Sequence, residues 1–251
     1  MNGRVTVEGL SHAFGSRPAL DGVSFAVAPG GLTALIGPTG CGKSTLLRVL
    51  AGLITPTAGM ATVDGRSTTG RPGLCAYMPQ GDTLLPWRRA LDNAMLGAEI
   101  TGHDLVAARA RAAGLFTRFG LAGFEQSWPK ELSGGMRQRV ALLRTVMTDH
   151  QVLLLDEPFA ALDAITRTDL QGWLAELLRT EARTTLLVTH DVDEALRLAD
   201  QLIVVSSRPG RIVDMIDLDT PRPRRLEEIT DPDFGRKKRR VLTALAEPVS
   251  R

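Results

Sequence analysis

The sequence predicts an α/β fold with a mostly parallel core sheet, and two observations lead to this prediction. Short, largely apolar runs at 33–36, 152–155 and 185–189 are typical of strands buried on both faces, as in parallel sheets. Residues 166–180 lie between the last two runs and have the spacing of an amphipathic helix, so they complete a strand–helix–strand unit. A chain of 251 residues is long enough for one large α/β domain, or for a core domain with a smaller lobe.

The remaining segments are assigned in chain order from their own patterns. Alternating apolar residues predict strands at 5–10 and 23–27, separated by turn-forming residues at 15–21. Ala, Leu and Arg at helical spacing, with Gly and Pro breaks, indicate a helical lobe inserted at about 81–149. A terminal helix is expected near 233–245, after a segment rich in Pro and Arg. Further expected elements are a helix over 44–50 and short strands at 61–63, 74–78, 201–205 and 211–215.

Composition narrows the class of protein. Hydrophobic residues make up 43% and charged residues 23%, which are ordinary values for a soluble globular chain. A net charge of +2 and an aromatic content of 4% predict no nucleic-acid partner, because they supply neither a strong positive field nor base-stacking rings. No apolar stretch approaches the roughly 20 residues of a membrane span, and the polar N-terminus predicts no signal peptide. The two cysteines, Cys41 and Cys75, suit a reducing cytosol.

The nine residues GPTGCGKST match in full the phosphate-binding pattern G-x-x-x-x-G-K-[ST]. Glycine lets the backbone curl so that successive N–H groups converge on phosphate oxygens. The lysine adds a positive charge for the β- and γ-phosphates, and the hydroxyl after it can ligate Mg²⁺. A strand before the loop and a helix after it complete the anion site. The predicted nucleotide-binding residues of this loop are Gly37, Pro38, Thr39, Gly40, Cys41, Gly42, Lys43, Ser44 and Thr45.

Two acidic residues follow the apolar run at 152–155. Asp156 and Glu157 stand at the C-terminal end of a predicted parallel strand, where ligand chemistry in open α/β sheets is located. Beside a bound nucleotide, Asp156 can hold Mg²⁺ directly or through water. Glu157 can then polarise a water molecule for attack on the γ-phosphate. The alternative is a pair of solvated acids at a strand end, which the complete phosphate loop disfavours.

The run LSGGMRQR forms a further motif. Ser133, Gly134 and Gly135 open a helix that is predicted to reach about Met147, so that N–H groups and the positive helix end face outward. Such a helix end attracts an anion, although a serine N-cap followed by glycines is also a common way to start a helix. Because the chain already has one phosphate loop, a second site for a γ-phosphate suggests that this helix binds the nucleotide of another copy, in trans.

Together, LSGGMRQR, the phosphate loop and the LLLDEP strand resemble the ATP-binding subunit of an ABC transporter over nearly the whole chain. The resemblance implies a P-loop NTPase ABC cassette: a mostly parallel core sheet, a small antiparallel β subdomain and an inserted helical subdomain at about 81–149. The ATPase domain would span 1–220, and a short C-terminal helical extension 221–251. Two copies would stack head to tail, with each ATP between the phosphate loop of one copy and residues 133–135 of the other.

The resemblance also assigns roles to single residues. Gln80 corresponds to the glutamine that touches Mg²⁺ and links the site to the helical lobe, and Asp163 belongs to the loop that crosses the dimer interface. His190 fits the switch histidine that contacts the γ-phosphate, and Phe14 fits the adenine-stacking aromatic, usually a tyrosine. The implied catalytic residues are Lys43, Glu157 and His190, and the implied Mg²⁺ ligands are Ser44, Gln80 and Asp156.

The stretch after Gln80 resembles importers of nitrate, sulfonate, taurine and related compounds, which share an LLPW sequence, here at 84–87. The implied function is an ATP-hydrolysing subunit that energises an ABC importer for a small solute. Its partners would be two transmembrane permease subunits and a separate extracytoplasmic solute-binding protein, and it would lie on the cytoplasmic face of the cell membrane. Trp87 would form an apolar knob that receives a helix of the membrane partner; the alternative is Trp87 in the core of the lobe.

Other functions stay open at this point. An exporter ATPase would share the main motifs, although the LLPW stretch and the separate subunit argue against it. A soluble ABC ATPase of DNA repair or translation would carry a long coiled-coil insertion or a second cassette. A non-enzymatic scaffold would have a degenerate site, whereas Lys43, Asp156, Glu157 and His190 are intact. The basic run at 236–240 is interpreted as a solvated helix face, with anionic lipid or nucleic acid as the alternative.

Overall fold

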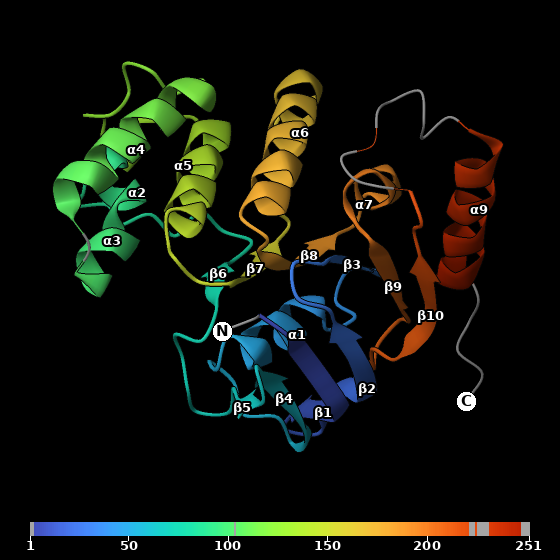
Figure 1. The fold of residues 1–251 in the computed structure, drawn as a ribbon. Coiled ribbons are helices and arrows are strands. Elements are labelled where there is room, and N and C mark those ends of the chain that lie inside the picture. Colours follow the sequence, from blue (N-terminus) through green and yellow to red (C-terminus); the bar gives the residue numbers. More distant parts are fainter. Residues whose placement is uncertain (1–2, 103, 221–223, 225–230, 247–251) are drawn as a thin grey trace.

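The larger of two sheets is the frame of the molecule. The computed structural model describes residues 3–102, 104–220, 224 and 231–246. Within them, six strands form a sheet in the order β10-β9-β3-β8-β7-β6 (Figure 1), and every neighbouring pair is parallel except β9 and β10. The predicted mostly parallel sheet is therefore confirmed. Its strands are β3 (Leu32–Ile36), β6 (Ala76–Met78), β7 (Val152–Asp156), β8 (Thr184–Thr189), β9 (Gln201–Val205) and β10 (Ile212–Asp217).

A second, antiparallel sheet has the strand order β2-β1-β4-β5. It lies on the opposite side of α1 (Lys43–Leu50) from the main helices, as Figure 1 shows. The small antiparallel sheet implied by the family resemblance is thus present. Its strands are β1 (Val5–Phe14), β2 (Arg17–Val27), β4 (Ala58–Val63) and β5 (Arg66–Ser67).

The segment 15–21 was predicted as a turn region, and most of it is strand. Only Gly15 and Ser16 form the turn, and Arg17 already pairs with Phe14 of β1. Glycine, proline and aspartate dominate the local pattern, but pairing with β1 decides the structure. β2 lies at the edge of its sheet, where an N–H group that points outward has no neighbouring strand to bond. Pro18, which has no N–H group, is therefore tolerated there.

Strand residues alternate between two hydrophobic cores because successive side chains point to opposite faces of a sheet. Leu154 of β7 and Val188 of β8 belong to the core shared with α1 and the antiparallel sheet. Their neighbours Leu155 and Leu187 belong to the core shared with the helices on the other face. Those helices are α2 (Ala90–Ala94), α4 (Leu105–Arg118), α5 (Gly134–Val146), α6 (Ala164–Thr180), α7 (Val192–Leu198) and α9 (Pro232–Ala246). The short helix α3 (Leu96–Thr101) packs against α2, α4 and α5.

Helices α2 to α5 occupy the segment predicted as an inserted helical lobe and gather on one side of the molecule (Figure 1). The helical pattern of this segment is confirmed, and the division of the chain into domains remains a prediction. In the part of the chain that the structure describes, no helix combines the length and apolarity needed to cross a bilayer.

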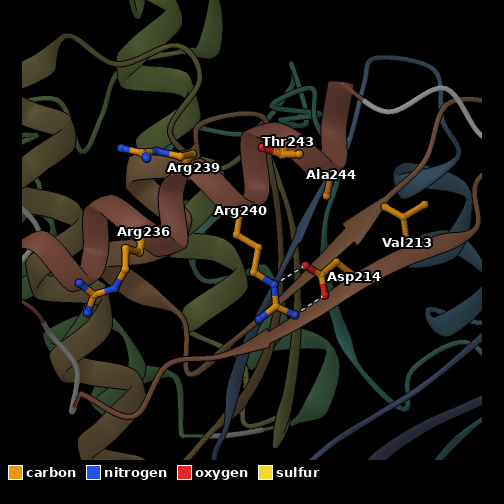
Figure 2. A pocket seen from close by; sticks show the side chains of 7 residues that line it. All are labelled: Val213, Asp214, Arg236, Arg239, Arg240, Thr243 and Ala244. Atoms are coloured by element: carbon orange, nitrogen blue, oxygen red, sulfur yellow. Dashed lines mark hydrogen bonds and ion pairs between the residues drawn. The ribbon is translucent and has the colours of Figure 1, made fainter.

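The predicted terminal helix is present as α9 and carries the basic run at 236–240. Four of the five cations are ion-paired: Arg236 and Lys237 with Asp233, Lys238 with Asp193, and Arg240 with Asp214. Figure 2 shows Arg240 reaching from α9 to Asp214 of β10, with N–O distances of 2.7 and 2.6 Å, beside a cavity of about 450 Å³. The run lies on a helix, as predicted, and the ion pairs of Lys238 and Arg240 help to hold α9 against α7 and β10.

One buried arginine was not foreseen from the sequence. The Arg224 guanidinium donates to the carbonyls of Leu196 and Ala199 at 2.9 and 2.6 Å, and to Leu218 at 3.2 Å. Leu196 lies in the last turn of α7 and Ala199 is its C-cap, so both carbonyls lie at a helix end where backbone acceptors lack partners within the helix and a cation is favoured. Arg224 thereby ties the chain beyond β10 back to the core.

Phe234→Ala should lower the free energy of unfolding by about 3 kcal/mol, because a buried phenyl ring leaves a cavity beneath α9. Phe234 is 3% exposed, whereas Leu242 on the same helix is 48% exposed. Leu242→Ala is therefore the matched control, with an expected change below about 0.5 kcal/mol. Urea unfolding of the two variants measures both values, and equal effects would contradict this packing of α9.

Candidate active site

The phosphate loop joins the end of β3 to the start of α1, as its pattern predicts. Gly42, the N-cap of α1, has a φ of 104°, and a Cβ atom there would lie 2.6 Å from the carbonyl oxygen of Ala19. A Cβ atom on Gly37 would lie 2.7 Å from the carbonyl oxygen of Val205. Both contacts are closer than a side chain permits. Glycine is therefore required at both positions by backbone approach, and at Gly42 by conformation as well.

Lys43 lies inside this loop. Its ammonium group is buried and donates to the carbonyls of Gly37 and Pro38 at 2.7 and 2.9 Å. Buried ammonium groups need such partners because water no longer solvates them. A positive charge is thus held at the N-terminus of α1, where backbone N–H groups also favour an anion.

A cavity of about 230 Å³ opens over the loop and brings together most of the predicted residues. Phe14 lines one wall, 49% exposed, and its ring meets the ring of His12 edge to face at 4.6 Å. Cys41, by contrast, is fully buried beneath the loop and is a free thiol, as is Cys75. The predicted residues that line the cavity are Phe14, Thr39, Gly40, Gly42, Lys43, Ser44, Thr45, Gln80 and Glu157.

Asp156 ends β7 beside Ser44. Burial raises the pKa of the Asp156 carboxyl, and a hydrogen bond from the Ser44 hydroxyl opposes that shift. Ser44 lines the cavity, and the buried Asp156 carboxyl beside it offers a second set of oxygen atoms; oxygen atoms are the ligands that Mg²⁺ prefers. Among the described residues, no cluster of three or more His, Cys, Asp or Glu could hold a metal alone. The donor set fits a Mg²⁺ ion that takes its other oxygens from phosphates and water.

Glu157 lies between two other predicted residues. Its Oε2 atom is 3.3 Å from Gln80 Nε2 and 3.4 Å from His190 Nδ1. Its backbone has a φ of 52°, a left-handed conformation that is uncommon for glutamate, and its N–H donates to the carbonyl of Val188 at 2.9 Å. This turn aims the carboxylate away from the direction of β7, toward Gln80 and His190. Strained backbone of this kind is concentrated at functional sites.

The residues expected to act in trans lie outside the cavity. Ser133 caps α5 by accepting from the N–H of Met136 at 3.2 Å, and Asp163 caps α6 by accepting from the N–H of Thr166 at 3.0 Å. The bond from the Thr166 N–H lowers the pKa of Asp163. A Cβ atom on Gly135 would lie 3.1 Å from the carbonyl of Ala161, so the two helix starts are neighbours. Neither lines the cavity that holds Lys43.

Two arginines of α5 hold the loop after Gln80. Arg137 Nε bonds to a carboxylate oxygen of Asp82 at 2.8 Å, and Arg144 Nη1 donates to the carbonyl of Thr83 at 2.8 Å. Gln138 of the same helix donates to the carbonyl of Glu157 at 3.3 Å. The helix capped by Ser133 is therefore connected within its own chain to the loop after Gln80 and to Glu157. These contacts were not predicted.

Trp87 is 70% exposed, so the alternative of a core tryptophan is wrong. Arg208, which was not predicted as a site residue, lines the cavity and donates to the carbonyl of Pro18 at 2.8 Å. The run SRPG at 207–210, which contains it, was the available signal.

A buried acid lies behind His190 and was not predicted either. Glu194, 6% exposed on α7, accepts from Gln171 Nε2 of α6 at 2.9 Å. Burial raises the pKa of the Glu194 carboxyl from 4.5 to about 7, against hydrogen bonds from Thr189 and Gln171 that lower it. In the sequence it resembles an ordinary acid in the first turn of a helix, and no local signal distinguishes it.

Comparison with known proteins agrees with this architecture. The family model for the ABC transporter matches residues 20–160. The taurine import ATP-binding protein TauB of Yersinia pestis is 41% identical over 86% of this chain and 84% of its own length. The aliphatic sulfonates import ATP-binding protein SsuB 1 of Rhodococcus jostii is 47% identical over 80% of this chain and 78% of its own. The ATP-binding cassette MJ0796, solved as a dimer in a post-hydrolysis state bound to ADP and Pi, has a TM-score of 0.78 and 26% identity and covers 86% of this chain and 100% of its own.

The fold and the site define an ATP-binding cassette. Its two sheets position a phosphate loop, an acid pair at the end of a parallel strand and a helix that begins with the LSGG sequence. The chain belongs to the ABC transporter family. Membership makes it an ATP-binding and ATP-hydrolysing protein, and the family resemblance of its motifs is confirmed.

Glu194→Gln should stabilise the protein at alkaline pH more than at acidic pH. The folded-state pKa of about 7 exceeds the ordinary value of 4.5, so the folded chain holds an extra proton between those pH values. Stability therefore falls as the pH rises through this window, and glutamine has no charge to bury. The gain over wild type should be about 2 kcal/mol larger at about pH 8 than at about pH 5. Urea unfolding at both pH values measures it, and a pH-independent difference would exclude a raised pKa.

Proposed function

We propose that this chain is the ATP-hydrolysing subunit of an ABC importer for a small solute of the nitrate, sulfonate or taurine kind. The observation that carries the ATPase is the single cavity onto which Lys43, Ser44, Gln80 and Glu157 converge. Support for import, and for this class of solute, comes from relatives that are named as taurine and aliphatic sulfonate import proteins at 41% and 47% identity.

Binding of ATP rests on the loop and the walls around it. Backbone N–H groups at the start of α1 and the Lys43 ammonium would hold the β- and γ-phosphates, and Phe14 offers a ring face for adenine. Ser44, Gln80 and Asp156 are the residues that would hold Mg²⁺, which when bound neutralises charge developing on the transferred phosphoryl group.

Hydrolysis would be carried by Glu157. Its carboxylate, fixed between Gln80 and His190, would orient a water molecule and accept its proton as the water attacks the γ-phosphorus. His190, whose side chain is 64% exposed, would donate a hydrogen bond to the γ-phosphate. Catalysis would therefore depend mainly on positioning and charge neutralisation.

A homodimer would complete the site. Residues 133–135 and Asp163 lie outside the cavity of their own chain, and a helix N-terminus is suited to an anion presented by another copy. The related cassette solved as a dimer with ADP and Pi supports this arrangement. Two permease subunits and a solute-binding protein would supply the membrane path and the specificity, with this chain peripheral on the cytoplasmic face and Trp87 contacting a permease.

Glu157→Gln should retain ATP binding and lose turnover by about 100-fold or more, because the carboxamide keeps the shape of the side chain and cannot accept the proton. Without hydrolysis the ATP-bound dimer should persist, and size-exclusion chromatography with Mg·ATP would detect that dimer. Asp169→Asn, which changes an exposed acid of α6, controls for loss of charge. Wild-type turnover in Glu157→Gln would remove Glu157 from its catalytic role.

Trp87→Ala should lower solute uptake by about tenfold and leave basal ATPase activity within about twofold, because an exposed aromatic anchor contributes to partner binding and not to the nucleotide cavity. Uptake of labelled taurine, an alkanesulfonate and nitrate would be measured in cells deleted for this chain and complemented with each variant. Val106→Ala, at an 80% exposed apolar residue of α4, is the control. Loss of efflux instead of uptake in the deletion strain would favour an exporter.

A further inference from the structure

A buried polar pair joins α6 to α7 behind the proposed hydrolytic site. Gln171 of α6 and Glu194 of α7 are 4% and 6% exposed, and Gln171 Nε2 donates to Glu194 Oε2 at 2.9 Å. The amide oxygen of Gln171 in turn accepts from Arg197 Nη1 at 3.5 Å. A leucine pair would hold two helices together without burying a carboxyl, so packing alone does not account for these residues.

The same carboxyl reaches the end of β8. The Thr189 hydroxyl donates to Glu194 and accepts from the N–H of Asp191 at 3.0 Å. Asp191 Oδ1 in turn accepts from the N–H of Glu194 at 3.1 Å, so Thr189, Asp191 and Glu194 form a hydrogen-bonded network. These bonds fix the backbone on both sides of residue 190. Since a hydroxyl has one proton to donate, the orientation of Thr189 depends on the acceptor that Glu194 provides.

This hydrogen-bonded network lies directly behind the proposed catalytic pair, Glu157 and His190. Thr189 is the last residue of β8, and the next residue, His190, places Nδ1 3.4 Å from Glu157 Oε2. A cavity of about 20 Å³ is lined by Glu157, His190 and Glu194 together with Phe159, Ala160, Arg167, Thr189 and Asp191. Any shift of the strand end would move His190 relative to Glu157, and small errors in catalytic geometry are costly.

Arg167 connects this hydrogen-bonded network to the loop expected at the dimer interface. Arg167 of α6 lies 3.8 Å from a carboxylate oxygen of Asp191 and donates to the carbonyl of Leu162 at 2.9 Å. Leu162 immediately precedes Asp163. The polar contacts of α6 therefore connect the loop ending at Asp163 with the turn that bears His190.

We propose that Glu194 is a positioning residue for ATP hydrolysis: through the Thr189 hydroxyl, and with Gln171, it fixes the turn from which His190 reaches Glu157. This inference rests on the proposed ATPase function and assigns no contact between Glu194 and ATP. The ionised carboxylate accepts from both Thr189 and Gln171, whereas the protonated acid replaces one of these acceptor positions with a donor. Positioning should therefore weaken as Glu194 takes up a proton, in the range around pH 7.

Several charged groups face this carboxyl and would share in any pH dependence. They come from α7, α6, the turn after β8 and the turn after β7: Asp191, Arg197, Arg167, His190 and Glu157. The ratio of wild-type kcat to variant kcat cancels titrations that the two proteins share. The pH dependence of that ratio therefore isolates the contribution of Glu194.

The test measures kcat and KM for Mg·ATP hydrolysis by the full chain between about pH 6 and pH 8.5. Glu194→Gln should equal wild type near pH 6 and fall about fivefold below it near pH 8, with KM within about twofold. Glu194→Ala should lose about tenfold or more at both pH values, because the acceptor is removed altogether. In a Thr189→Val background, which lacks the hydroxyl, Glu194→Gln should change kcat by less than about twofold.

Asp193→Asn is the matched control, because Asp193 is the exposed neighbour of Glu194 and pairs with Lys238 of α9. It should leave kcat and its pH profile unchanged. Glu194→Gln is expected to be no less stable than wild type, so unfolding does not explain a lower kcat. A Glu194→Gln profile parallel to wild type at every pH, or an undiminished effect in Thr189→Val, would overturn the inference. Wild-type protein no more active than Glu157→Gln would instead overturn the proposed function.

Discussion

Parallel pairing of β3, β7 and β8 is the interaction on which the site depends. Ile36 of β3 pairs with Thr189 of β8, and Asp156 of β7 pairs with Val188, so these strands end at almost one level. The phosphate loop, the acid pair and His190 are far apart in the sequence, and this register brings them to one edge of the sheet. A one-residue slip would turn each strand's side chains to the opposite face, away from their cores.

That edge accumulates buried polar and charged groups, and each is stabilised by specific partners. The Lys43 ammonium is held by two loop carbonyls, the Asp156 carboxyl by the Ser44 hydroxyl, and the Glu194 carboxyl by Gln171 and Thr189. Burial raises the pKa of both carboxyls, so their charged forms lower the stability of the fold. A phosphate-binding site needs such preorganised groups, and the apolar cores on the two faces of the sheet supply the compensating stability.

Sequence reasoning succeeded where a motif carries its own backbone requirement. Gly42 must be glycine because its φ is 104° and a carbonyl lies close by, and this demand is visible as a pattern in the chain. It failed where a role arises from distant partners. Arg137 and Arg144 look like solvated helix cations in the sequence, yet both hold the loop after Gln80. The turn predicted at 15–21 failed for the same reason, since pairing with β1 overrode the local composition.

Sequence patterns were enough to predict the family, the strand–loop–helix around the phosphate loop, the acid pair and the helix start at Ser133, because each depends on residues that are neighbours in the chain. Only the folded chain shows that Glu157 lies between Gln80 and His190, and that Glu194 lies behind the turn bearing His190. Those contacts join separate strands and helices, and their distances follow from sheet register and helix packing. A pattern of residues along one segment carries no information about either.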